Sequence, residues 1–427
     1  MQKCKFVGHK TYRTLMRILI VGNGGRESAI ANKLCKDSRI SEMYFANGNA
    51  TTDKLGKNII ASTPKEMAAY ALKEKIDLTI VGPEAPLVDG IVEEFKENGL
   101  RIFGAKSRAA QLEGSKAFSK KFMQKYGVKT AEAKVFESYQ DALNYLEGKT
   151  FPIVVKASGL AGGKGVVICD DIESAKATLH SFMISKIYGD AGIQVIIEDY
   201  LDGFEASIIA FSNGKKLFPC IPVKDYKKVG NGDKGLNTGG MGSVAPSPEF
   251  KPEHQEDFEK NILEPTLKGL HEEGLGFHGF IFFGLMVTKN GSYLLEYNMR
   301  LGDPETQSLL PLLENNLLDV IEDCLAGKEV ELKFKNQKAV CLVMCSGGYP
   351  LNHEVGFEIK GMDKVTHSEL LFAGAQMRGN KVVTSGGRVL NLVGVGDTYD
   401  DARKKVYQDA LPLNFDYAFY RDDIGKF

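Results

Sequence analysis

Short apolar runs alternate with helix-like amphipathic stretches over residues 17–103. Short apolar runs of this kind are typical of buried strands. Because strands separated by helices form parallel sheets through crossover connections, we expect a small α/β domain at the start of the chain. Its strands are expected at residues 17–21, 43–46, 78–81 and 101–104.

The pattern changes from about residue 119. A helix-like stretch at 117–126 leads to short strands, and period-two alternation then dominates two longer segments before a final unit begins near residue 335. The expected strands of this part lie within 151–156, 165–169, 194–198, 206–223, 279–298, 339–345, 381–384 and 387–395. Further helices are expected at 172–183, 255–273 and 402–411.

Composition and charge narrow the class of protein. A chain of 427 residues is too long for one hydrophobic core, so about three or four domains are expected. Lys and Arg number 54 against 55 Asp and Glu, and this balance gives no basic surface for nucleic acid or membrane lipid. The seven scattered cysteines form no C-x-x-C pair, which argues against zinc and favours a reduced cytoplasm. We therefore expect a cytoplasmic enzyme with small-molecule substrates and neither a nucleic-acid nor a membrane partner.

The first glycine cluster, Gly22-Asn-Gly-Gly-Arg-Glu, does not match a dinucleotide fingerprint. Glu27 replaces the third glycine, and the second strand ends at Asn47 instead of an acidic residue. The motif still opens a helix whose free N–H groups favour an anion. The cluster is either a phosphate site for a small substrate or a tight turn.

The second cluster, Gly159-Leu-Ala-Gly-Gly-Lys-Gly, is not a Walker A loop. Gly165 stands where Ser or Thr would bind Mg²⁺, and a β-prone run follows where a helix is required. A glycine-rich turn between strands suits a lid whose N–H groups close over phosphates, and Lys156 can reach the same phosphates. The alternative is an ordinary hairpin.

The segment Leu294-Leu-Glu-Tyr-Asn-Met-Arg places Glu296, Asn298 and Arg300 on one face of a strand. Two oxygen ligands followed by a guanidinium suit Mg²⁺ and a transferring phosphoryl group. A solvated strand face would carry the same residue types.

Two further segments carry candidate binding groups. Residues 196–205 resemble an adenine hinge, with Glu205 in reach of a ribose, although a surface turn would look alike. Residues 224–242 mix charge with glycine, which favours a loop that closes over substrate against a disordered loop.

Together these motifs resemble the ATP-grasp superfamily and, within it, the glycinamide ribonucleotide synthetases (phosphoribosylamine–glycine ligases). The resemblance runs from about Met16 to the end of the chain. The segments that carry it lie at 22–27, 81–87, 110–116, 156–165, 237–242, 302–307 and 386–390.

The resemblance implies an α/β, multidomain ATP-grasp fold. Its parts would be an N-terminal parallel-sheet (Rossmann-like) domain at 16–118, a mobile lid subdomain at 119–193, a core subdomain with an antiparallel sheet at 194–330, and a C-terminal α+β domain at 331–427. It also implies a ligase that converts ATP, glycine and 5-phosphoribosylamine through glycyl phosphate, with ATP as co-substrate and Mg²⁺ (or Mn²⁺) as cofactor. We expect the protein to be a monomer.

The resemblance also implies roles for individual residues. Arg300 and Asp225 would be catalytic, with Asp225 pairing with the glycine ammonium, and Glu296 and Asn298 would bind the metal. The residues implied for ATP are Lys116, Lys156, Gly162, Gly163, Lys164, Glu198, Tyr200, Leu201 and Glu205. Those implied for the other substrates are Gly24, Gly25, Asn49, Glu84, Thr238 and Gly239.

The chain departs from the family pattern near the small-substrate motifs. The departures are Ser28 for histidine, Asn47 and Thr51 within the P-G-N-A-G-T motif, Lys224 and Tyr226 for glutamine and histidine, and Leu236 for proline. Two alternatives therefore stand beside the ligase: another ATP-grasp enzyme, such as a biotin-dependent carboxylase subunit or a formate- or bicarbonate-using purine enzyme, and a non-catalytic or altered-specificity relative. Intact Lys156, Glu296, Asn298 and Arg300 favour catalysis.

Overall fold

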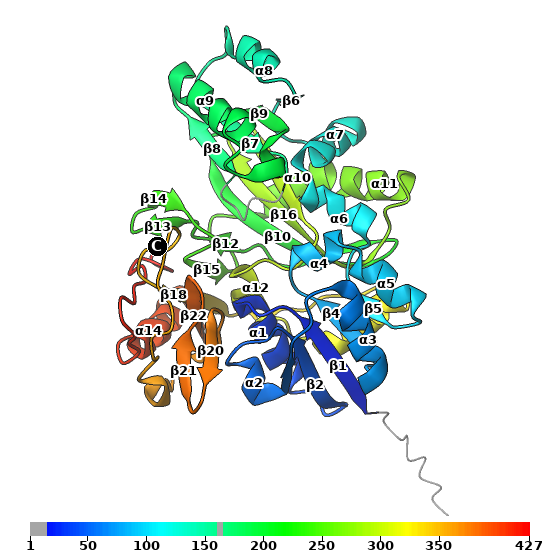
Figure 1. Cartoon of the computed structure of the whole chain (residues 1–427), viewed down its shortest axis with the longest axis vertical. Helices are drawn as coiled ribbons and strands as arrows, with labels where there is room; N and C mark the ends of the chain where they lie inside the picture. The colour runs from blue at the N-terminus through cyan, green and yellow to red at the C-terminus, as the bar shows by residue number, and fades with distance from the viewer. Residues whose placement is uncertain (1–14, 160–164) are drawn as a thin grey trace, which may run out of the picture.

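The computed structural model describes residues 15–159 and 165–427, and its arrangement is shown in Figure 1. The N-terminal sheet is parallel in the order β3-β2-β1-β4-β5, which confirms the predicted parallel-sheet domain. Its strands are β1 (Met16–Val21), β2 (Ile40–Ala46), β3 (Lys57–Ile59), β4 (Leu78–Val81) and β5 (Ile102–Phe103). Its helices are α1 (Gly25–Leu34), α2 (Thr52–Leu55), α3 (Pro64–Glu74), α4 (Glu84–Val88), α5 (Ile91–Glu97) and α6 (Ser107–Gly114).

The sequence explains where the crossover helix α3 begins. Thr63 caps α3 by accepting a hydrogen bond from the Glu66 N–H at 3.2 Å, and Pro64 occupies the first helical position, where no N–H is needed. The strand β4 is buried along its whole length and β1 over its last four residues, as expected for a sheet with helices on both faces.

A small antiparallel sheet in the order β6-β9-β7-β8 forms the upper part of the molecule in Figure 1. Its strands are β6 (Ala133–Phe136), β7 (Ile153–Ala157), β8 (Val166–Cys169) and β9 (Val195–Asp199). It packs with the helices α8 (Tyr139–Leu146) and α9 (Ile172–Leu179), which is followed by η1 (His180–Ile184) and η2 (Gly189–Gly192). The sheet takes in β9, which lies beyond the boundary expected at residue 193, because β9 pairs with both β6 and β7.

A second antiparallel sheet, in the order β11-β10-β16-β17, lies below the first. Its strands are β10 (Phe204–Asn213), β11 (Leu217–Pro219), β16 (His278–Thr288) and β17 (Gly291–Asn298). The helices around it are α7 (Lys116–Tyr126), α10 (Pro252–Phe258), η3 (Glu259–Leu263), α11 (Glu264–Glu272), α12 (Glu305–Leu309) and α13 (Leu317–Leu325). The predicted core antiparallel sheet is therefore confirmed.

The C-terminal part combines a sheet in the order β12-β15-β18-β22-β19 with α14 (Tyr399–Ala410). The strands are β12 (Lys224–Asp225), β15 (Gly242–Ala245), β18 (Lys338–Cys345), β19 (Glu369–Phe372) and β22 (Arg388–Gly396). Two hairpins, β13 (Lys228–Gly230) with β14 (Lys234–Asn237) and β20 (Ala375–Arg378) with β21 (Lys381–Thr384), and the short η4 (Met362–Lys364) complete it. The strands β12 and β15 come from the middle of the chain, so the substrate loop predicted at 224–242 is built into the C-terminal sheet.

Across the two described stretches of the chain, no helix is both long enough and apolar enough to cross a membrane.

The parallel sheet meets the core sheet where Gly104 lies against β16. The Gly104 N–H donates to the His278 carbonyl at 2.7 Å, and a Cβ added to Gly279 would lie 3.0 Å from the Gly104 Cα. Two backbones approach here because neither residue has a side chain.

We expect Gly279→Ala to lower the free energy of unfolding by about 1–3 kcal/mol, because the added methyl group must push two backbones apart. Urea unfolding followed by circular dichroism measures the change. A midpoint equal to that of the unmodified protein would show that the contact between the two sheets is loose.

Candidate active site

A buried carboxylate shared by two lysines lies where the small sheet β6-β9-β7-β8, here named the lid sheet, faces α7. Glu198, in β9, lies 2.8 Å from the Lys156 ammonium of β7 and 3.0 Å from the Lys120 ammonium of α7. All three side chains are less than a tenth exposed. Burial alone would raise the pKa of Glu198, but the two ammonium groups outweigh it and lower that pKa.

This triad carries more positive than negative charge. Two ammonium groups share one carboxylate, and the Lys156 ammonium also donates to the Leu295 carbonyl of β17 at 3.3 Å. A buried site with one surplus cation attracts an anion, and Lys156 is the residue predicted to meet phosphates. The Glu198 side chain is engaged by the two lysines, and the predicted contact of residues 198–201 with the adenine edge stays a prediction.

Lys116, Tyr200 and Leu201, which are also predicted for ATP, lie next to elements of this triad. Lys116 begins α7, where its N–H donates to the Ser158 carbonyl at 2.7 Å, and its charge reaches Glu296. Tyr200 and Leu201 directly follow β9, and the Tyr200 side chain is 40% exposed. Gly162, Gly163 and Lys164 lie outside the described residues.

The strand β17 carries the predicted metal ligands across from the triad. Glu296, Asn298 and Arg300 are partly open, whereas Tyr297 and Met299 are buried. Burial would raise the pKa of Glu296, but the neighbouring Lys227, Lys116, Lys156 and Arg300 lower it. Glu296 therefore presents an ionised carboxylate.

The fit of a divalent cation depends on what completes its shell. In the part of the chain that the structure describes, no group of three or more His, Cys, Asp or Glu side chains is arranged to hold a metal. Glu296 and Asn298 offer two hard oxygen donors, which suits an ion that also binds nucleotide phosphates. The donor set therefore fits a metal that arrives with ATP.

Arg300 is held by two carboxylates. Its Nη2 lies 2.9 Å from the buried Glu113 of α6, and its Nε lies 3.5 Å from Glu84 at the start of α4. Nη2 also donates to the Asn298 side chain at 3.4 Å. Burial and the Glu84 charge raise the pKa of Glu113 in spite of Arg300, whereas Arg300 lowers the pKa of Glu84. The guanidinium is thereby aligned beside the metal ligands.

A second charged group surrounds Asp225 at the end of β12. Its Oδ1 is buried without a hydrogen-bond partner among the described residues, and the carboxylate of Glu305 is close by. Burial and Glu305 raise the pKa of Asp225 well above its ordinary value. The Lys227 ammonium pairs with Glu205 at 2.6 Å and also neighbours Glu296 and Asp225. A further cation at Asp225 would satisfy its unpaired oxygen.

The loop that follows β14 packs against the charged group around Asp225. The Thr238 hydroxyl donates to the Lys227 carbonyl at 2.8 Å and accepts from the Gly240 N–H at 2.9 Å. The Gly239 N–H donates to the Tyr349 hydroxyl at 2.8 Å. Gly240 has a φ of +113°, and a Cβ there would lie 2.7 Å from the Asp225 Oδ1, so glycine is required at this position.

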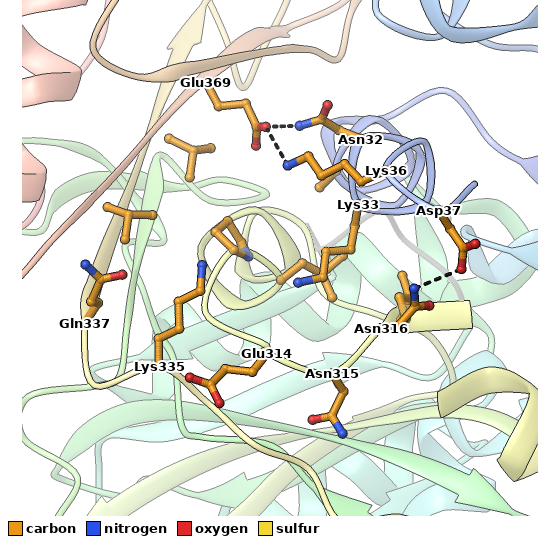
Figure 2. A pocket seen from close by; sticks show the side chains of 16 residues that line it. Asn32, Lys33, Lys36, Asp37, Glu314, Asn315, Asn316, Lys335, Gln337 and Glu369 are labelled. Atoms are coloured by element: carbon orange, nitrogen blue, oxygen red, sulfur yellow. Dashed lines mark hydrogen bonds and ion pairs between the residues drawn. The ribbon is translucent and has the colours of Figure 1, made fainter. Parts of the chain in front are cut away.

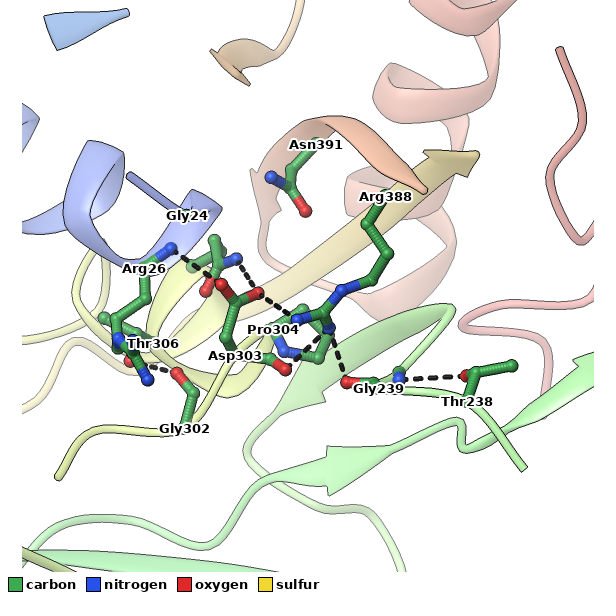
Figure 3. A network of polar contacts seen from close by, with 12 residues as sticks. Gly24, Arg26, Thr238, Gly239, Gly302, Asp303, Pro304, Thr306, Arg388 and Asn391 are labelled. Carbon is green, nitrogen blue, oxygen red and sulfur yellow. Dashed lines mark hydrogen bonds and ion pairs between the residues drawn. The ribbon is translucent and has the colours of Figure 1, made fainter. Parts of the chain in front are cut away.

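Figure 3 shows how the start of α1 meets the other parts of the chain. The Asp303 carboxylate accepts from the Arg26 N–H at 3.2 Å and pairs with Arg388 of β22 at 3.4 Å. A Cβ on Gly24 would lie 2.9 Å from Asp303, and one on Gly25 would lie 2.3 Å from Asn391. Close packing of three parts of the chain therefore explains these two glycines, independently of any phosphate.

Asn49 is enclosed by the protein. Its side chain is 3% exposed, and its amide donates to the Asn23 and Phe372 carbonyls at 2.8 Å. Its oxygen accepts from the Thr51 N–H at 2.8 Å. Asn49 holds the glycine loop in place, and its predicted contact with the sugar phosphate stays a prediction.

The structure brings Lys156 and Glu198 into one charge group, Glu84 and Arg300 into a second, and Glu205 and Asp225 into a third. It also adds residues to which the sequence alone gave no role. These are Arg26, Glu113, Lys120, Lys227, Asp303, Glu305 and Arg388. Most of these residues lie in or beside the motif segments, so the motifs could have indicated that they belong to the site. Their contacts could not be predicted, because the partner residues are distant in sequence.

A separate cavity of about 670 Å³ lies between α1, the α12–α13 connection and β19 (Figure 2). Lys33, Lys36 and Lys335 line it together with acidic groups, and Lys36 pairs with Glu369 at 4.0 Å. Burial and the two neighbouring lysines lower the pKa of Lys33 to about 8. None of the predicted site residues lines this cavity, so it is distinct from the candidate active site.

Two antiparallel sheets that meet where Lys156 donates to the Leu295 carbonyl, beside the predicted metal ligands Glu296 and Asn298, are the arrangement of an ATP-grasp fold. Three family models match the chain in succession: the N domain of phosphoribosylglycinamide synthetase at residues 16–113, its ATP-grasp (A) domain at 114–306 and its C domain at 339–427. The chain belongs to the phosphoribosylglycinamide synthetase family. It is an ATP-dependent, ADP-forming carbon–nitrogen ligase that uses a divalent metal ion.

Individual relatives agree with this placement. A phosphoribosylamine–glycine ligase of Clostridium acetobutylicum is 48% identical over 415 residues, covering 96% of this chain and 100% of that protein. One from Fusobacterium nucleatum is 46% identical over 96% of this chain and 98% of its own length. The crystal structure of the Thermotoga maritima phosphoribosylamine–glycine ligase has a TM-score of 0.85 at 35% identity and covers 96% of this chain and 100% of that chain.

A more distant likeness concerns the fold alone. The biotin carboxylase domain of Hydrogenobacter thermophilus 2-oxoglutarate carboxylase has a TM-score of 0.74 at 14% identity, covering 95% of this chain and 92% of that one.

We expect Glu198→Gln to lower the free energy of unfolding by about 3 kcal/mol, because it leaves two buried ammonium groups without a counter-charge. Glu198 has a lowered pKa in the fold, so its contribution is present above its unfolded pKa of ~4.3 and is lost as the pH falls through the folded value. Urea unfolding at pH 7 and at progressively lower pH measures both effects.

The double variant Lys120→Met/Glu198→Gln is the matched control. Removing one ammonium relieves the repulsion, so the double variant should be more stable than Glu198→Gln alone. If the two variants were equally stable, the charges of the triad would not be coupled.

Proposed function

We propose that this chain joins glycine to 5-phosphoribosylamine, with ATP converted to ADP and phosphate, as a step of de novo purine biosynthesis. The observation that carries the assignment is the buried, unpaired Oδ1 of Asp225 beside Glu305, because this acidic group suits a cation next to the strand that carries Glu296 and Asn298. The ammonium of an amino acid supplies such a cation. The relatives named as phosphoribosylamine–glycine ligases support the two small substrates.

The reaction takes two transfers. A carboxylate oxygen of glycine attacks the γ-phosphorus of ATP, and the bond to ADP breaks, which gives glycyl phosphate. The amine of phosphoribosylamine then attacks the acyl carbon, phosphate leaves, and the amine loses a proton. Acyl phosphates react with water, so the site must exclude it between the two transfers.

The nucleotide would lie between the lid and core sheets. Lys156 and Lys116 bind its phosphates, with Gly162, Gly163 and Lys164 closing over them. The backbone from Glu198 to Leu201 meets the adenine, and Glu205, held by Lys227, meets the ribose. The surplus positive charge of the Glu198 triad supports this placement of the phosphates.

The metal would be Mg²⁺, or Mn²⁺ in its place, held by Glu296 and Asn298. When bound, it neutralises the phosphates during transfer. Arg300 directs its guanidinium at the developing charge of the acyl phosphate, and the carboxylates of Glu113 and Glu84 hold it in that orientation.

The amine substrate would enter beside the N-terminal domain. Glu84 lies next to Arg300 and therefore next to the reacting centre. Gly24 and Gly25 would present the start of α1 to the sugar phosphate, with Asn49 holding their loop, and Thr238 and Gly239 would close the loop over glycine.

Three of the departures from the family pattern make contacts within the protein. Lys224 pairs with Glu249 at 2.6 Å, and the Tyr226 hydroxyl accepts from the Gly425 N–H at 3.2 Å. The Ser28 hydroxyl donates to the Phe372 carbonyl at 2.6 Å. These contacts support an active ligase over a non-catalytic or altered-specificity relative.

We further infer that the enzyme works as a monomer in the cytoplasm. The balanced charge and the free thiols of the described cysteines support this setting. The division into units at 16–118, 119–193, 194–330 and 331–427 remains our proposal; β9 at the second boundary belongs to the lid sheet.

The direct test measures phosphate release and glycinamide ribonucleotide formation with ATP, Mg²⁺, glycine and freshly prepared phosphoribosylamine. We expect phosphate and product in equal amounts. ATP hydrolysis that does not depend on glycine would contradict the proposal.

Glu296→Gln should lower kcat by at least ~100-fold while leaving the fold intact, because it removes the charged metal ligand. Steady-state rates at increasing Mg²⁺ measure the loss. Tyr293→Phe on the same strand is the control and should keep its rate. Normal turnover of Glu296→Gln at high Mg²⁺ would remove β17 from the metal site.

Asp225→Asn should raise the KM for glycine by about tenfold or more, equivalent to ~1.4 kcal/mol, because the ammonium loses its ionic partner. Lys224→Gln, on the adjacent residue, should change this KM by only about two- to threefold, since Lys224 pairs with Glu249. Glycine saturation at fixed ATP compares the three proteins. Equal KM values for Asp225→Asn and the unmodified enzyme would place the amino group elsewhere.

A further inference from the structure

The hairpin β13–β14 extends from the base of the proposed glycine site and buries little apolar surface. Every residue of β14 is exposed, including Leu236, which is 51% exposed. Asp225 and Lys227 precede the hairpin, and Thr238 follows it, with its N–H donating to the Lys227 carbonyl at 2.8 Å. The position of the hairpin therefore bears directly on the residues that would hold glycine.

The C-terminal segment of the chain lies against this hairpin, where Figure 1 places the end of the chain beside β13 and β14. Its central residue is Arg421, whose side chain is only 2% exposed. The Arg421 Nη1 donates to the Lys228 carbonyl at the start of β13 at 2.9 Å and to the Asp233 carboxylate in the turn at 2.8 Å. The guanidinium also stacks on the Tyr226 ring at 5.1 Å.

Asp423 orients this guanidinium. Its two oxygens accept from the Arg421 Nε and Nη2 at 2.7 Å each, a bidentate pair that fixes the plane of the group. Asp423 also accepts from the Gly232 N–H at 2.7 Å, and the Asp422 N–H donates to the Asn231 side chain at 3.1 Å. Four residues of the hairpin and its turn are thus held by the C-terminal segment: Lys228, Asn231, Gly232 and Asp233.

The segment itself is anchored to the C-terminal domain. The Tyr407 hydroxyl of α14 donates to the Arg421 carbonyl at 2.8 Å and accepts from the Ile424 N–H at 3.0 Å. The Gly425 N–H donates to the Tyr226 hydroxyl at 3.2 Å. The contacts therefore form a chain from α14 to the residue that follows Asp225.

The anchoring bears on the active site because Asp225 and Lys227 lie just before the hairpin, which begins at Lys228. A hairpin that buries little apolar surface opens locally at low cost, since few contacts are lost. The hydrogen bonds of Arg421 and Asp423 hold the hairpin in place, so that Asp225 and Lys227 are already positioned when an ammonium arrives.

We propose that Arg421 is a positioning residue for the amino-acid substrate: through the β13–β14 hairpin, it holds Asp225 and Lys227 in the geometry that receives the ammonium. The proposal rests on the proposed role of Asp225 in binding glycine. Arg421 itself touches no substrate.

The test compares the KM for glycine with the KM for ATP in Arg421→Met and Arg421→Lys. Methionine keeps much of the buried side-chain volume and loses every hydrogen bond, whereas lysine keeps the charge and loses the planar fork. We expect Arg421→Met to raise the KM for glycine by about fivefold or more, with the KM for ATP changed by less than about threefold, and Arg421→Lys to lie between it and the unmodified enzyme. Hydrogen exchange should show faster exchange at residues 228–237.

Asp409→Asn is the matched control for general destabilisation. Asp409 of α14 is buried and accepts from the N–H groups of Thr366, His367 and Ser368, away from the hairpin. This variant should lower the melting temperature and leave the KM for glycine unchanged. A parallel rise of both KM values in Asp409→Asn and Arg421→Met would overturn the proposal.

Two further comparisons separate the possible failures. If Arg421→Met keeps its KM for glycine while Asp225→Asn raises it, the positioning role is wrong and the proposed glycine site stands. If neither variant changes that KM in an active enzyme, the glycine site itself is wrong. Should Arg421→Met fail to fold, Asp423→Asn, which breaks the bidentate pair, answers the same question by the same measurements.

Discussion

The Asp303 carboxylate is the point on which the arrangement of the site depends. It receives the N–H of Arg26 at the start of α1, the side-chain amide of Gln307 in α12 and the guanidinium of Arg388 in β22. Burial would raise the pKa of Asp303, but Arg388 and Arg26 lower it, so the carboxylate stays charged in the interior. A buried charge tolerates little displacement of its partners, and the N-terminal, core and C-terminal parts are therefore held in one geometry. Because Asp303 lies between Arg300 and Glu305 in sequence, the same contacts set the positions of both.

The site has opposite charge imbalances at its two ends. On the lid side, Lys120 and Lys156 share the single carboxylate of Glu198, which leaves a surplus of positive charge. On the loop side, Asp225 and Glu305 crowd together, and burial raises the pKa of both. The first end suits phosphates, and the second suits an ammonium. The phosphates arrive with ATP and the ammonium arrives with the amino acid, so the charge at each end is balanced only when both substrates are present.

Much of the fold could be predicted from local pattern. The strands β1, β4, β7 and β18 could be predicted from their apolar runs, because a buried strand needs continuous or alternating apolar residues whatever surrounds it. The short strands β3, β12 and β15 escaped prediction, since their pairing partners, and not their own composition, make them strands. For the same reason, the sequence assigned residues 224–242 to a loop, whereas the structure places both ends of that segment in the C-terminal sheet.

The sequence by itself determined which chemical groups the protein carries: the ATP-grasp motifs, the proposed oxygen ligands Glu296 and Asn298, the guanidinium of Arg300 and the carboxylate of Asp225. Residue types at fixed spacing carry that information because each chemical step needs particular groups. The tertiary structure decided which groups face one another. An unbroken strand would put Leu294 on the same face as Glu296, but the register shifts opposite Gly284 and leaves Leu295 unpaired, so Leu294 is buried while Glu296 opens to the site. The burial of Arg421 against the hairpin and the sharing of Glu198 by two lysines were likewise decided by contacts between distant segments, because the energy of a buried charge depends on its neighbours in space and not on its neighbours in sequence.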